Sequence, residues 1–250
     1  MTGLRTLLAR GRYGFRVRIS HLPAIYLPMA ARKRRMVGLD GDRDAATPVV
    51  MATQLVMEAF PRSGNTFAYA ALRSVEPTLE IAHHLHAPAQ LIAAARMGKP
   101  ALVIVRQPRD AVLSFLLRHP ELGTRQALDA WIAFHEKLRP WEDSLVVATF
   151  DQVTSDFGRV IARVNGRFGT SLAVFEHTPG NVAACFAAIE ARNAKRFGAG
   201  AVQESGVARP SAERQRNKAD TEARWERAVR AVRRARADGL FAHFERLSRR

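Results

Sequence analysis

Two segments of this chain combine glycine, hydroxyl and arginine residues in patterns suited to binding oxyanions. The first, residues 57–67 (MEAFPRSGNTF), is an apolar run that leads through Pro61 to a turn at Gly64 and then to Asn65 and Thr66. A glycine turn that opens a helix leaves backbone N–H groups without intrahelical partners, and the helix dipole adds positive potential there. The segment therefore predicts an anion site.

A second segment repeats this arrangement further along the chain. It reads LVIVRQPRDAVLSF, and in it Arg106 and Ser114 stand on either side of another junction between a strand and a helix. Such a junction is again suited to an anion. Two anion sites at one edge of a sheet favour a single ligand that carries two phosphate groups.

The two segments together resemble the donor-binding motifs of the sulfotransferases that use 3′-phosphoadenosine-5′-phosphosulfate (PAPS). PRSGNTF is similar to this family's 5′-phosphosulfate loop, and Arg106, Pro108, Asp110 and Ser114 match its 3′-phosphate motif with nothing inserted. A short motif with one glycine is weak evidence by itself, but the pair in this order and separation is specific. The resemblance covers roughly residues 53–170 and implies a P-loop-like sulfotransferase domain.

The resemblance implies that the first motif holds the sulfuryl donor. The backbone from Arg62 to Thr66, with the hydroxyl groups of Ser63 and Thr66, would bind the 5′-phosphate and the departing sulfuryl oxygens. Arg62 stands where many relatives have lysine, and it would act catalytically by neutralising the leaving oxygen through its charge and bidentate hydrogen bonds. It would not act as an acid, because arginine stays protonated. Phe67 would stack on adenine or, alternatively, be an ordinary core residue.

The second motif would bind the 3′-phosphate through Arg106, at the end of a strand, and Ser114, in the following helix. The alternatives are a surface ion pair between Arg106 and Asp110 and a packing role for Ser114. Asp110 itself fits a structural role, because an acid in the first turn of a helix complements the helix dipole. The predicted donor-binding residues are Arg62, Ser63, Gly64, Asn65, Thr66, Phe67, Arg106, Ser114 and Arg209.

The catalytic base is predicted in the histidine-rich segment AHHLHAP, residues 82–88. His86-Ala87-Pro88 resembles a segment of the cytosolic sulfotransferases whose histidine deprotonates the acceptor hydroxyl. Histidine titrates near neutral pH and can accept that proton at little cost. We therefore predict His86 as the base. His84, at a position where those relatives have lysine, is its possible substitute.

The same three histidines also raise the question of a metal site. A strand would place neighbouring side chains on opposite faces, and no nearby cysteine or carboxylate completes a coordination shell. We therefore predict no metal.

Two parts of the chain depart from the family pattern. Relatives carry a tyrosine at a strand end that reaches the adenine, and here the corresponding residue is Phe150, which keeps the ring and loses the hydroxyl. Relatives also carry a C-terminal Arg-Lys-Gly segment that closes over the 3′-phosphate. In this chain Arg209, within residues 206–211, is its stand-in. A missing lid would lower donor affinity without removing the chemistry.

Hydrophobic periodicity predicts the elements that must position these residues. Apolar runs at 54–60, 79–83, 101–105 and 145–150 predict strands, which alternate with helical patterns at 65–75, 88–97, 109–118, 124–139 and 154–169. The alternation predicts an α/β fold with a mostly parallel central sheet flanked by helices on both faces. In such sheets ligands bind beyond the carboxyl ends of the strands, where both motifs begin.

The ends of the chain follow a different pattern. Residues 1–50 show weak periodicity, and we expect a basic N-terminal extension, partly disordered or packed on a sulfotransferase-like domain of residues 51–250. The C-terminal part predicts a helix at 181–196 and a loop from 198 to about 220. A tail helix should follow, with Trp225, Val229 and Val232 on one stripe and an interruption at Asp238-Gly239.

Composition bounds the class of protein. A chain of 250 residues with 47% apolar content can bury a sizeable core within one domain. Its single cysteine, Cys185, excludes an internal disulfide and is typical of a reducing compartment, so we expect a cytoplasmic protein. No apolar run reaches the ~18 residues that would cross a bilayer, and the stretch at 19–31 does not read as a secretory signal.

The net charge of +16 is concentrated at the two ends of the chain. Residues 1–36 carry nine Lys or Arg and no acid, and residues 208–250 carry thirteen basic and six acidic side chains. These ends could bind nucleic acid, a polyanionic acceptor or an anionic membrane surface, and the last would make the protein peripheral to the membrane. A solvated basic surface without a partner is the simpler alternative.

Two functions follow from these observations. The first is an enzyme, a PAPS-dependent sulfotransferase that modifies a hydroxyl or amine of a small-molecule, carbohydrate or lipid-linked acceptor, with an acceptor pocket near residues 119–125 and 198–218. The second is a non-catalytic module that keeps the nucleotide fold and binds nucleic acid or acidic glycan through its basic ends. A phosphate-transferring P-loop enzyme is disfavoured, because the lysine-containing loop of that class is absent.

Overall fold

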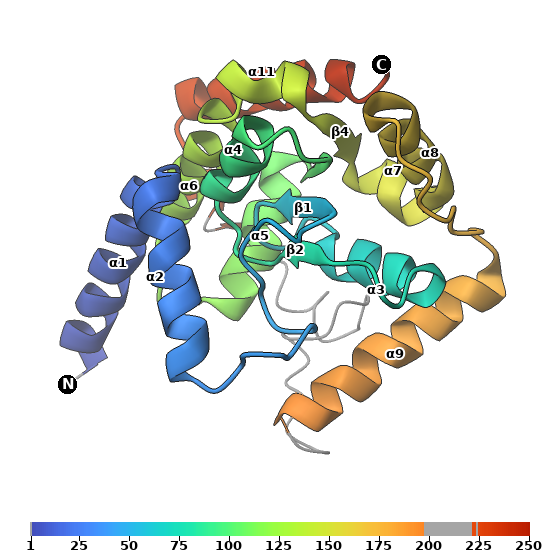
Figure 1. Ribbon diagram of the computed structural model, residues 1–250. Helices are drawn as coiled ribbons and strands as arrows, with labels where there is room; N and C mark the ends of the chain where they lie inside the picture. Colours follow the sequence, from blue (N-terminus) through green and yellow to red (C-terminus); the bar gives the residue numbers. More distant parts are fainter. Residues whose placement is uncertain (1, 198–221, 224) are drawn as a thin grey trace.

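Short apolar runs form the parallel sheet that the sequence predicts. The computed structural model describes residues 2–197, 222–223 and 225–250, and within this part of the chain four strands pair in parallel (Figure 1). In order across the sheet they are β2 (Ile81–His83), β1 (Leu55–Ala59), β3 (Ala101–Val105) and β4 (Val146–Thr149). The predicted α/β fold with a parallel sheet flanked by helices is confirmed.

Successive strands are added on opposite sides of β1. The chain passes from β1 to β2 on one side and then returns to place β3 on the other side of β1, where Val56 is paired with Ala101. Ligands in open α/β sheets bind at the carboxyl ends of the strands next to such a switch point. The two predicted motifs follow β1 and β3, which are the two strands at this switch.

Helices cover both faces of the sheet because its central strands alternate between two cores. In β3, Val103 and Val105 point to one core, whereas Leu102 and Ile104 point to the other. One core is completed by α4 (Pro88–Arg96), α5 (Pro108–Arg118), α6 (Thr124–Glu136) and α11 (Ala231–Leu247). The other is completed by α3 (Asn65–Val75), α7 (Phe150–Ser155), α8 (Phe157–Phe168) and α9 (Pro179–Phe197).

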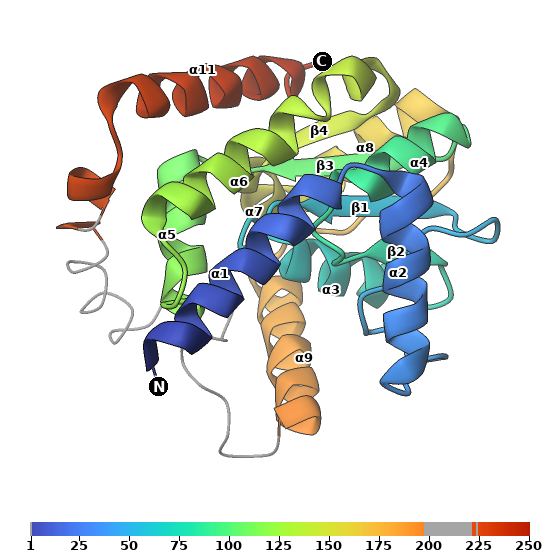
Figure 2. The same ribbon diagram turned by 90° about the vertical axis from the view of Figure 1, so that its left-hand side faces the viewer.

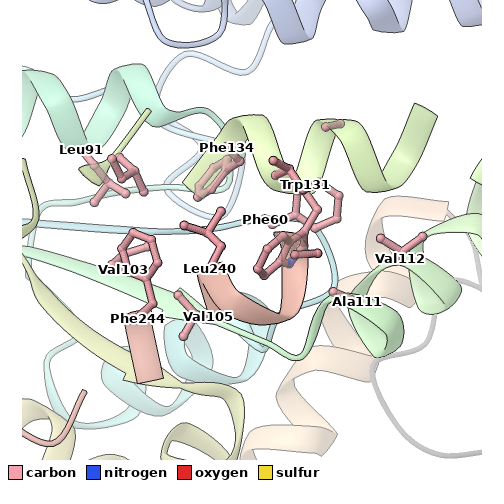
Figure 3. Close-up of a cluster of buried hydrophobic side chains, with 14 of the residues drawn as sticks. Phe60, Leu91, Val103, Val105, Ala111, Val112, Trp131, Phe134, Leu240 and Phe244 are labelled. Carbon is pink, nitrogen blue, oxygen red and sulfur yellow. The ribbon is translucent and has the colours of Figure 1, made fainter. Parts of the chain in front are cut away.

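Aromatic side chains fill the first of these cores. Trp131 and Phe134 of α6 lie around Phe60, which directly follows β1, and Phe244 of α11 lies near Val103 (Figure 3). Phe60 and Phe134 make an edge-to-face contact with ring centroids 6.4 Å apart. This packing anchors the segment that precedes the first motif, because Phe60 is only 2% exposed.

The N-terminal region forms two helices, where the sequence predicts no regular element. They are α1 (Thr2–Ile19) and α2 (Pro23–Met36), and both lie on the side of the molecule that faces the viewer in Figure 2. Arg16 of α1 donates a 2.7 Å hydrogen bond to the carbonyl of Leu85, and Tyr26 of α2 is 8% exposed. Arginine side chains that bind distant carbonyls hold these helices, and hydrophobic periodicity does not record such contacts.

Two predicted helix boundaries were wrong. The helix expected at 154–169 is two helices, α7 and α8, because Thr149 forms a capping box with Gln152 and Asp156 accepts a hydrogen bond from the N–H of Arg159. The strand expected to reach 150 therefore ends at Thr149. A short 3₁₀ helix at Arg139–Ser144 follows α6, which ends earlier than predicted.

The break expected at Asp238-Gly239 does not occur, since α11 runs through both residues. The chain instead leaves the helical conformation at Val229 and Arg230. A glycine inside a helix costs about 1 kcal/mol relative to alanine, and burial of Leu240, Phe244 and Leu247 offsets this cost. Val232, which the sequence places on the apolar stripe, is 83% exposed.

The loop predicted from 198 to about 220 lies outside the described residues. Among the helices that are described, none has both the length and the apolar composition needed to cross a bilayer.

Candidate functional site

The turn between β1 and α3 has the backbone that the first motif predicts. Gly64 has φ +95° in the left-handed region and stands at the N-cap of α3. A Cβ atom at this position would lie 3.1 Å from Cδ2 of Phe150. Both the positive φ and the lack of space favour glycine here. The turn can therefore direct the first backbone N–H groups of α3 into one small volume.

Buried polar side chains on either side of Gly64 lack partners. Ser63 is 0% exposed and Asn65 is 3% exposed. Within the described residues, Ser63 Oγ and both amide atoms of Asn65 have no hydrogen-bond partner. Buried polar atoms in folded proteins are nearly always paired, and an unpaired one costs about 1–3 kcal/mol. A bound oxyanion could accept hydrogen bonds from two of these atoms, Ser63 Oγ and Asn65 Nδ2.

The second motif meets the first through two hydrogen bonds. Arg62 Nε donates to Ser114 Oγ at 3.1 Å, which joins the loop to α5. Arg106 Nη1 donates to the carbonyl oxygen of Arg62 at 2.7 Å, which joins the end of β3 to the same loop. The two predicted anion motifs therefore lie side by side at the switch point of the sheet.

Arg106 also lies against an aromatic ring. Its guanidinium carbon is 4.1 Å from the ring centroid of Phe150, the first residue of α7. A cavity of about 100 Å³ opens beside it at the carboxyl ends of β3 and β4. Its lining is Val105, Arg106, Gln107, Asp110, Thr149, Phe150, Asp151 and Phe241. Phe150 thus supports both Arg106 and the turn at Gly64.

The three histidines after β2 occupy different environments. His83 is buried in the sheet, with its ring 4.0 Å from that of Tyr69, and burial lowers its pKa to about 3. His84 turns toward the loop, where its Nε2 lies 3.3 Å from Thr66 Oγ1. The structure therefore brings His84 next to the first motif and keeps His83 in the core.

His86 is held in one tautomer beside a cavity. Its Nδ1 lies 2.9 Å from the carbonyl oxygen of Ala59. Because a carbonyl only accepts, Nδ1 carries the proton and Nε2 carries the lone pair. Burial lowers the pKa of His86 to about 4, although 24% of the side chain remains exposed. The imidazole is therefore neutral at pH 7 with its lone pair at Nε2. The lowered pKa also makes it a weaker base than the near-neutral titration that the sequence analysis assumed.

The cavity beside His86 has a volume of about 80 Å³ and also borders Pro61 of the first motif. Its walls are mostly aromatic or aliphatic, and α1 closes one side through Tyr13 and Val17. This wall differs from the prediction, in which residues 1–50 are an extension that does not contribute to the site. The lining residues are Tyr13, Arg16, Val17, Ser20, Phe60, Pro61, His86, Phe115, His119, Ala130 and Phe134.

Glu58 is a residue of this site that the sequence analysis missed. It lies in β1 with 0% exposure, and its carboxyl group accepts hydrogen bonds from the backbone N–H groups of Leu85 at 2.6 Å and His86 at 2.9 Å. Gln90 Nε2 donates a third at 3.1 Å. Burial raises the pKa of Glu58 to about 8, against the opposing effect of these donors. An acid inside an apolar strand was the signal that could have revealed it.

Backbone strain gathers at the same edge of the sheet. Among the described residues, the non-glycine residues with positive φ are Arg62 at 70°, His84 at 60° and His86 at 50°. A positive φ costs free energy in residues that have a Cβ atom. Such a conformation persists only where the surrounding structure imposes it. Such strain is typical of functional sites, and here it sets the directions of an arginine and two histidines.

Two other predicted residues lie apart from this arrangement. Phe67 is 5% exposed, and its ring packs in the core 5.6 Å from that of Phe186 and 6.3 Å from that of Phe175. This core packing leaves little of the ring accessible to a nucleotide base. Arg209 lies outside the described residues. Within the described part of the chain, no group of three or more His, Cys, Asp or Glu residues could hold a metal ion.

No protein-family model matches this chain, and no curated protein matches its sequence. A search of solved structures finds similarity to the crystal structure of mouse sulfotransferase SULT7A1 complexed with PAP. The two share 11% sequence identity with a TM-score of 0.44, over 79% of this chain and 92% of that chain.

Proposed function

We propose that the protein is a sulfotransferase that moves a sulfuryl group from PAPS to a hydroxyl or amine of an acceptor. The observation that carries this proposal is the pair of buried side chains, Ser63 and Asn65, that lack partners within the described residues. They flank a left-handed glycine at the start of α3. The resemblance of both motifs to the family pattern supports PAPS as the ligand of this loop.

Donor binding would use both motifs. The N–H groups of the first turn of α3, with Ser63, Asn65 and Thr66, provide donors for the 5′-phosphosulfate. Arg106 and Ser114 provide a charge and a hydroxyl for the 3′-phosphate. Because Arg62 bonds to Ser114 and Arg106 bonds to the carbonyl of Arg62, binding at one motif would order the other. The residues present therefore suit a ligand with two phosphate groups.

The bond to be broken is the S–O bond between the sulfuryl group and the 5′-phosphate, whose oxygen keeps the electron pair. Arg62 would stabilise the charge that builds on this oxygen. A new bond forms between sulfur and the acceptor oxygen or nitrogen, and the acceptor loses a proton. His86 would take this proton at Nε2, because its Nδ1 is already occupied by the carbonyl of Ala59.

The acceptor would enter the cavity at His86. This cavity borders Pro61 and offers mostly aromatic and aliphatic walls, so it suits the apolar part of an acceptor whose hydroxyl or amine reaches His86.

Isothermal titration of the full chain with 3′,5′-adenosine bisphosphate tests the donor site. We expect saturable binding at one site per chain. Ser63→Ala should weaken this binding and leave stability unchanged or higher, because it removes a buried hydroxyl that has no partner within the described residues. Asn65→Asp should weaken binding at least about tenfold, since it adds a negative charge of the same shape. Asn181→Asp, at an exposed site on α9, is the matched control.

The contrary result is a folded chain that shows no binding at millimolar ligand. Turnover is then tested with a mass-labelled donor and an extract of the cells from which the protein comes. Steeply salt-dependent binding of nucleic acid or acidic glycan, with neither bisphosphate binding nor turnover, would instead favour a non-catalytic module.

A further inference from the structure

We infer that the outward faces of α1 and α2 form a docking surface for an anionic lipid bilayer. This surface consists of the exposed apolar and basic side chains of residues 3–36 and is called the α1–α2 surface below. The inference is independent of the proposed enzyme activity, because it depends on residues on the opposite faces of these helices from those that contact the domain.

Helix α1 carries apolar side chains on two faces. Tyr13 and Val17 on its inner face pack against the core. Leu4, Leu8 and Phe15 are 65%, 57% and 59% exposed. Their spacing of four and seven residues places them on one face of a helix. Burial of the inner face accounts for the packing of α1 on the domain but leaves this second stripe open to solvent.

Helix α2 repeats the same pattern. Tyr26 faces inward at 8% exposure, whereas Ile25, Met29 and Met36 are 48%, 50% and 75% exposed. These three residues again have the spacing of one helical face. Helices α1 and α2 lie on the same side of the molecule (Figure 2). Because each stripe consists of exposed side chains, one extended partner on that side could contact both.

Basic side chains surround the two stripes. Residues 1–36 contain nine Lys or Arg and no acid. Three of the nine hold the helices in place: Arg10 donates to the carbonyl of Glu121, Arg16 to that of Leu85 and Arg34 to that of Ala46. The other six are exposed, and they are Arg5, Arg12, Arg18, Arg32, Lys33 and Arg35.

This combination favours a lipid surface over other partners. Helices that lie in a membrane interface bury an apolar stripe among acyl chains and place basic residues at anionic headgroups. A nucleic acid would match the charge but would leave six large apolar side chains without a function. A second copy of the chain would bring the same positive charges together. Charge and apolarity together are therefore complementary to an anionic bilayer.

Vesicle sedimentation with the full chain tests the inference. The probes are vesicles of phosphatidylcholine alone and of equimolar phosphatidylcholine and phosphatidylglycerol. We expect binding to the anionic vesicles, weaker binding at high salt and little binding to the neutral ones. Replacement of Leu4, Leu8 and Phe15 by serine should lower vesicle affinity at least about tenfold. The unfolding midpoint should fall only slightly, because these side chains are exposed and only the lower helix propensity of serine weakens α1.

A second pair of variants tests whether vesicle binding depends on the positive charge of α1 or on the total charge of the protein. Arg5→Gln, Arg12→Gln and Arg18→Gln together should weaken binding to the anionic vesicles at least about tenfold. The matched control replaces Arg159, Arg230 and Arg246 by glutamine, which removes the same charge from exposed sites on α8 and around α11. Its binding should stay within about twofold of the unchanged protein.

Four results would overturn the inference. One is an unchanged chain that does not bind anionic vesicles at low salt. Another is an equal loss in the control and the α1 arginine variants. The third is a serine variant that keeps full vesicle binding. If the unchanged chain also binds duplex DNA as tightly as vesicles, the basic side chains would be assigned to nucleic acid. The fourth is a dimer, measured by sedimentation velocity, that the serine variant abolishes, which would assign the apolar stripes to a second copy of the chain.

Discussion

The backbone N–H of His86 donates a 2.9 Å hydrogen bond to Oε2 of Glu58, a carboxyl group with no exposed surface near the carboxyl end of β1. The other carboxyl oxygen accepts from the N–H of Leu85 at 2.6 Å. Glu58 thus binds the turn in which His86 has positive φ, and it ties the orientation of this histidine to the middle of the sheet. We regard Glu58 as a positioning residue for His86.

Glu58→Gln should lower the free energy of unfolding by about 1–3 kcal/mol. Above its pKa of about 8 Glu58 is a carboxylate whose two oxygens both accept backbone N–H groups, so the amide nitrogen of glutamine would face a donor and leave it unsatisfied. Urea unfolding at pH 9 measures the change. Glu245→Gln, at the edge of α11 with its side chain 40% exposed, is the control and should change stability by less than about 0.5 kcal/mol. Equal stability of the two variants would contradict the role of Glu58.

Stability should decline between pH 6.5 and 8 because of the same residue. Burial raises the pKa of Glu58 from its ordinary value of 4.5 to about 8, so the folded chain keeps a proton that the unfolded chain has released. The stabilising contribution is complete below about pH 4.5 and is lost as the pH rises through about 8. Urea unfolding across this range should show the decline in the unchanged protein and a flatter profile in Glu58→Gln.

Buried histidines have the opposite effect on the pH dependence of stability, and their effect falls in a lower pH range. Burial lowers the pKa of His83 to about 3 and that of His86 and His135 to about 4, from an ordinary value of 6.5. Their contribution is complete above about pH 6.5 and is lost as the pH falls toward 4. A decline above pH 6.5 therefore reports Glu58 rather than these histidines. The same slope in the unchanged protein and in Glu58→Gln would refute the assignment.

His86→Asn should lower the rate of sulfuryl transfer by about 10²–10⁴-fold, the range expected for loss of a general base. Bisphosphate affinity should stay the same, because His86 lies at the acceptor cavity rather than against the donor loop. The rate of the unchanged protein should not fall between pH 8 and 6, since a pKa of about 4 keeps the imidazole neutral there. His84→Asn is the matched variant, and it should affect donor affinity through Thr66.

These two variants also distinguish the two histidines as bases. A full rate in His86→Asn, together with a large loss in His84→Asn, would transfer the role of base to His84. Loss of bisphosphate binding in His86→Asn would instead point to a change in the fold of the loop.

Gly64→Ala should destabilise the protein more than Gly98→Ala. Both glycines have positive φ, at 95° and 62°, but a Cβ at Gly64 would lie 3.1 Å from Phe150 whereas a Cβ at Gly98 would have no atom within 4 Å. Gly98→Ala therefore measures the cost of the backbone conformation, about 1–2 kcal/mol. Thermal unfolding gives the extra cost at Gly64, and Phe150→Leu should reduce it. Equal costs at both glycines would show that the turn does not press on Phe150.

The sequence by itself determined the parallel sheet and the location of the two segments that are predicted to bind anions. The run from Ala101 to Val105 is apolar throughout, as a strand covered on both faces must be, and the structure buries all of it. The glycine turn before Asn65 and the strand end at Arg106 are local signals. Because parallel strands end at one edge of the sheet, their order along the chain was enough to bring them near one another.

Only the tertiary structure decided how the site is closed and how its side chains are directed. Glu58 meets His86 across 28 residues, and Arg16 of α1 reaches Leu85 across 69. The left-handed backbone at Arg62, His84 and His86 likewise occurs at residues that form hydrogen bonds with distant segments. Hydrophobic periodicity indicates which face of a helix or strand is apolar. It does not indicate hydrogen bonds between residues that are far apart in the chain. These long-range hydrogen bonds orient His86 and hold α1 over the cavity.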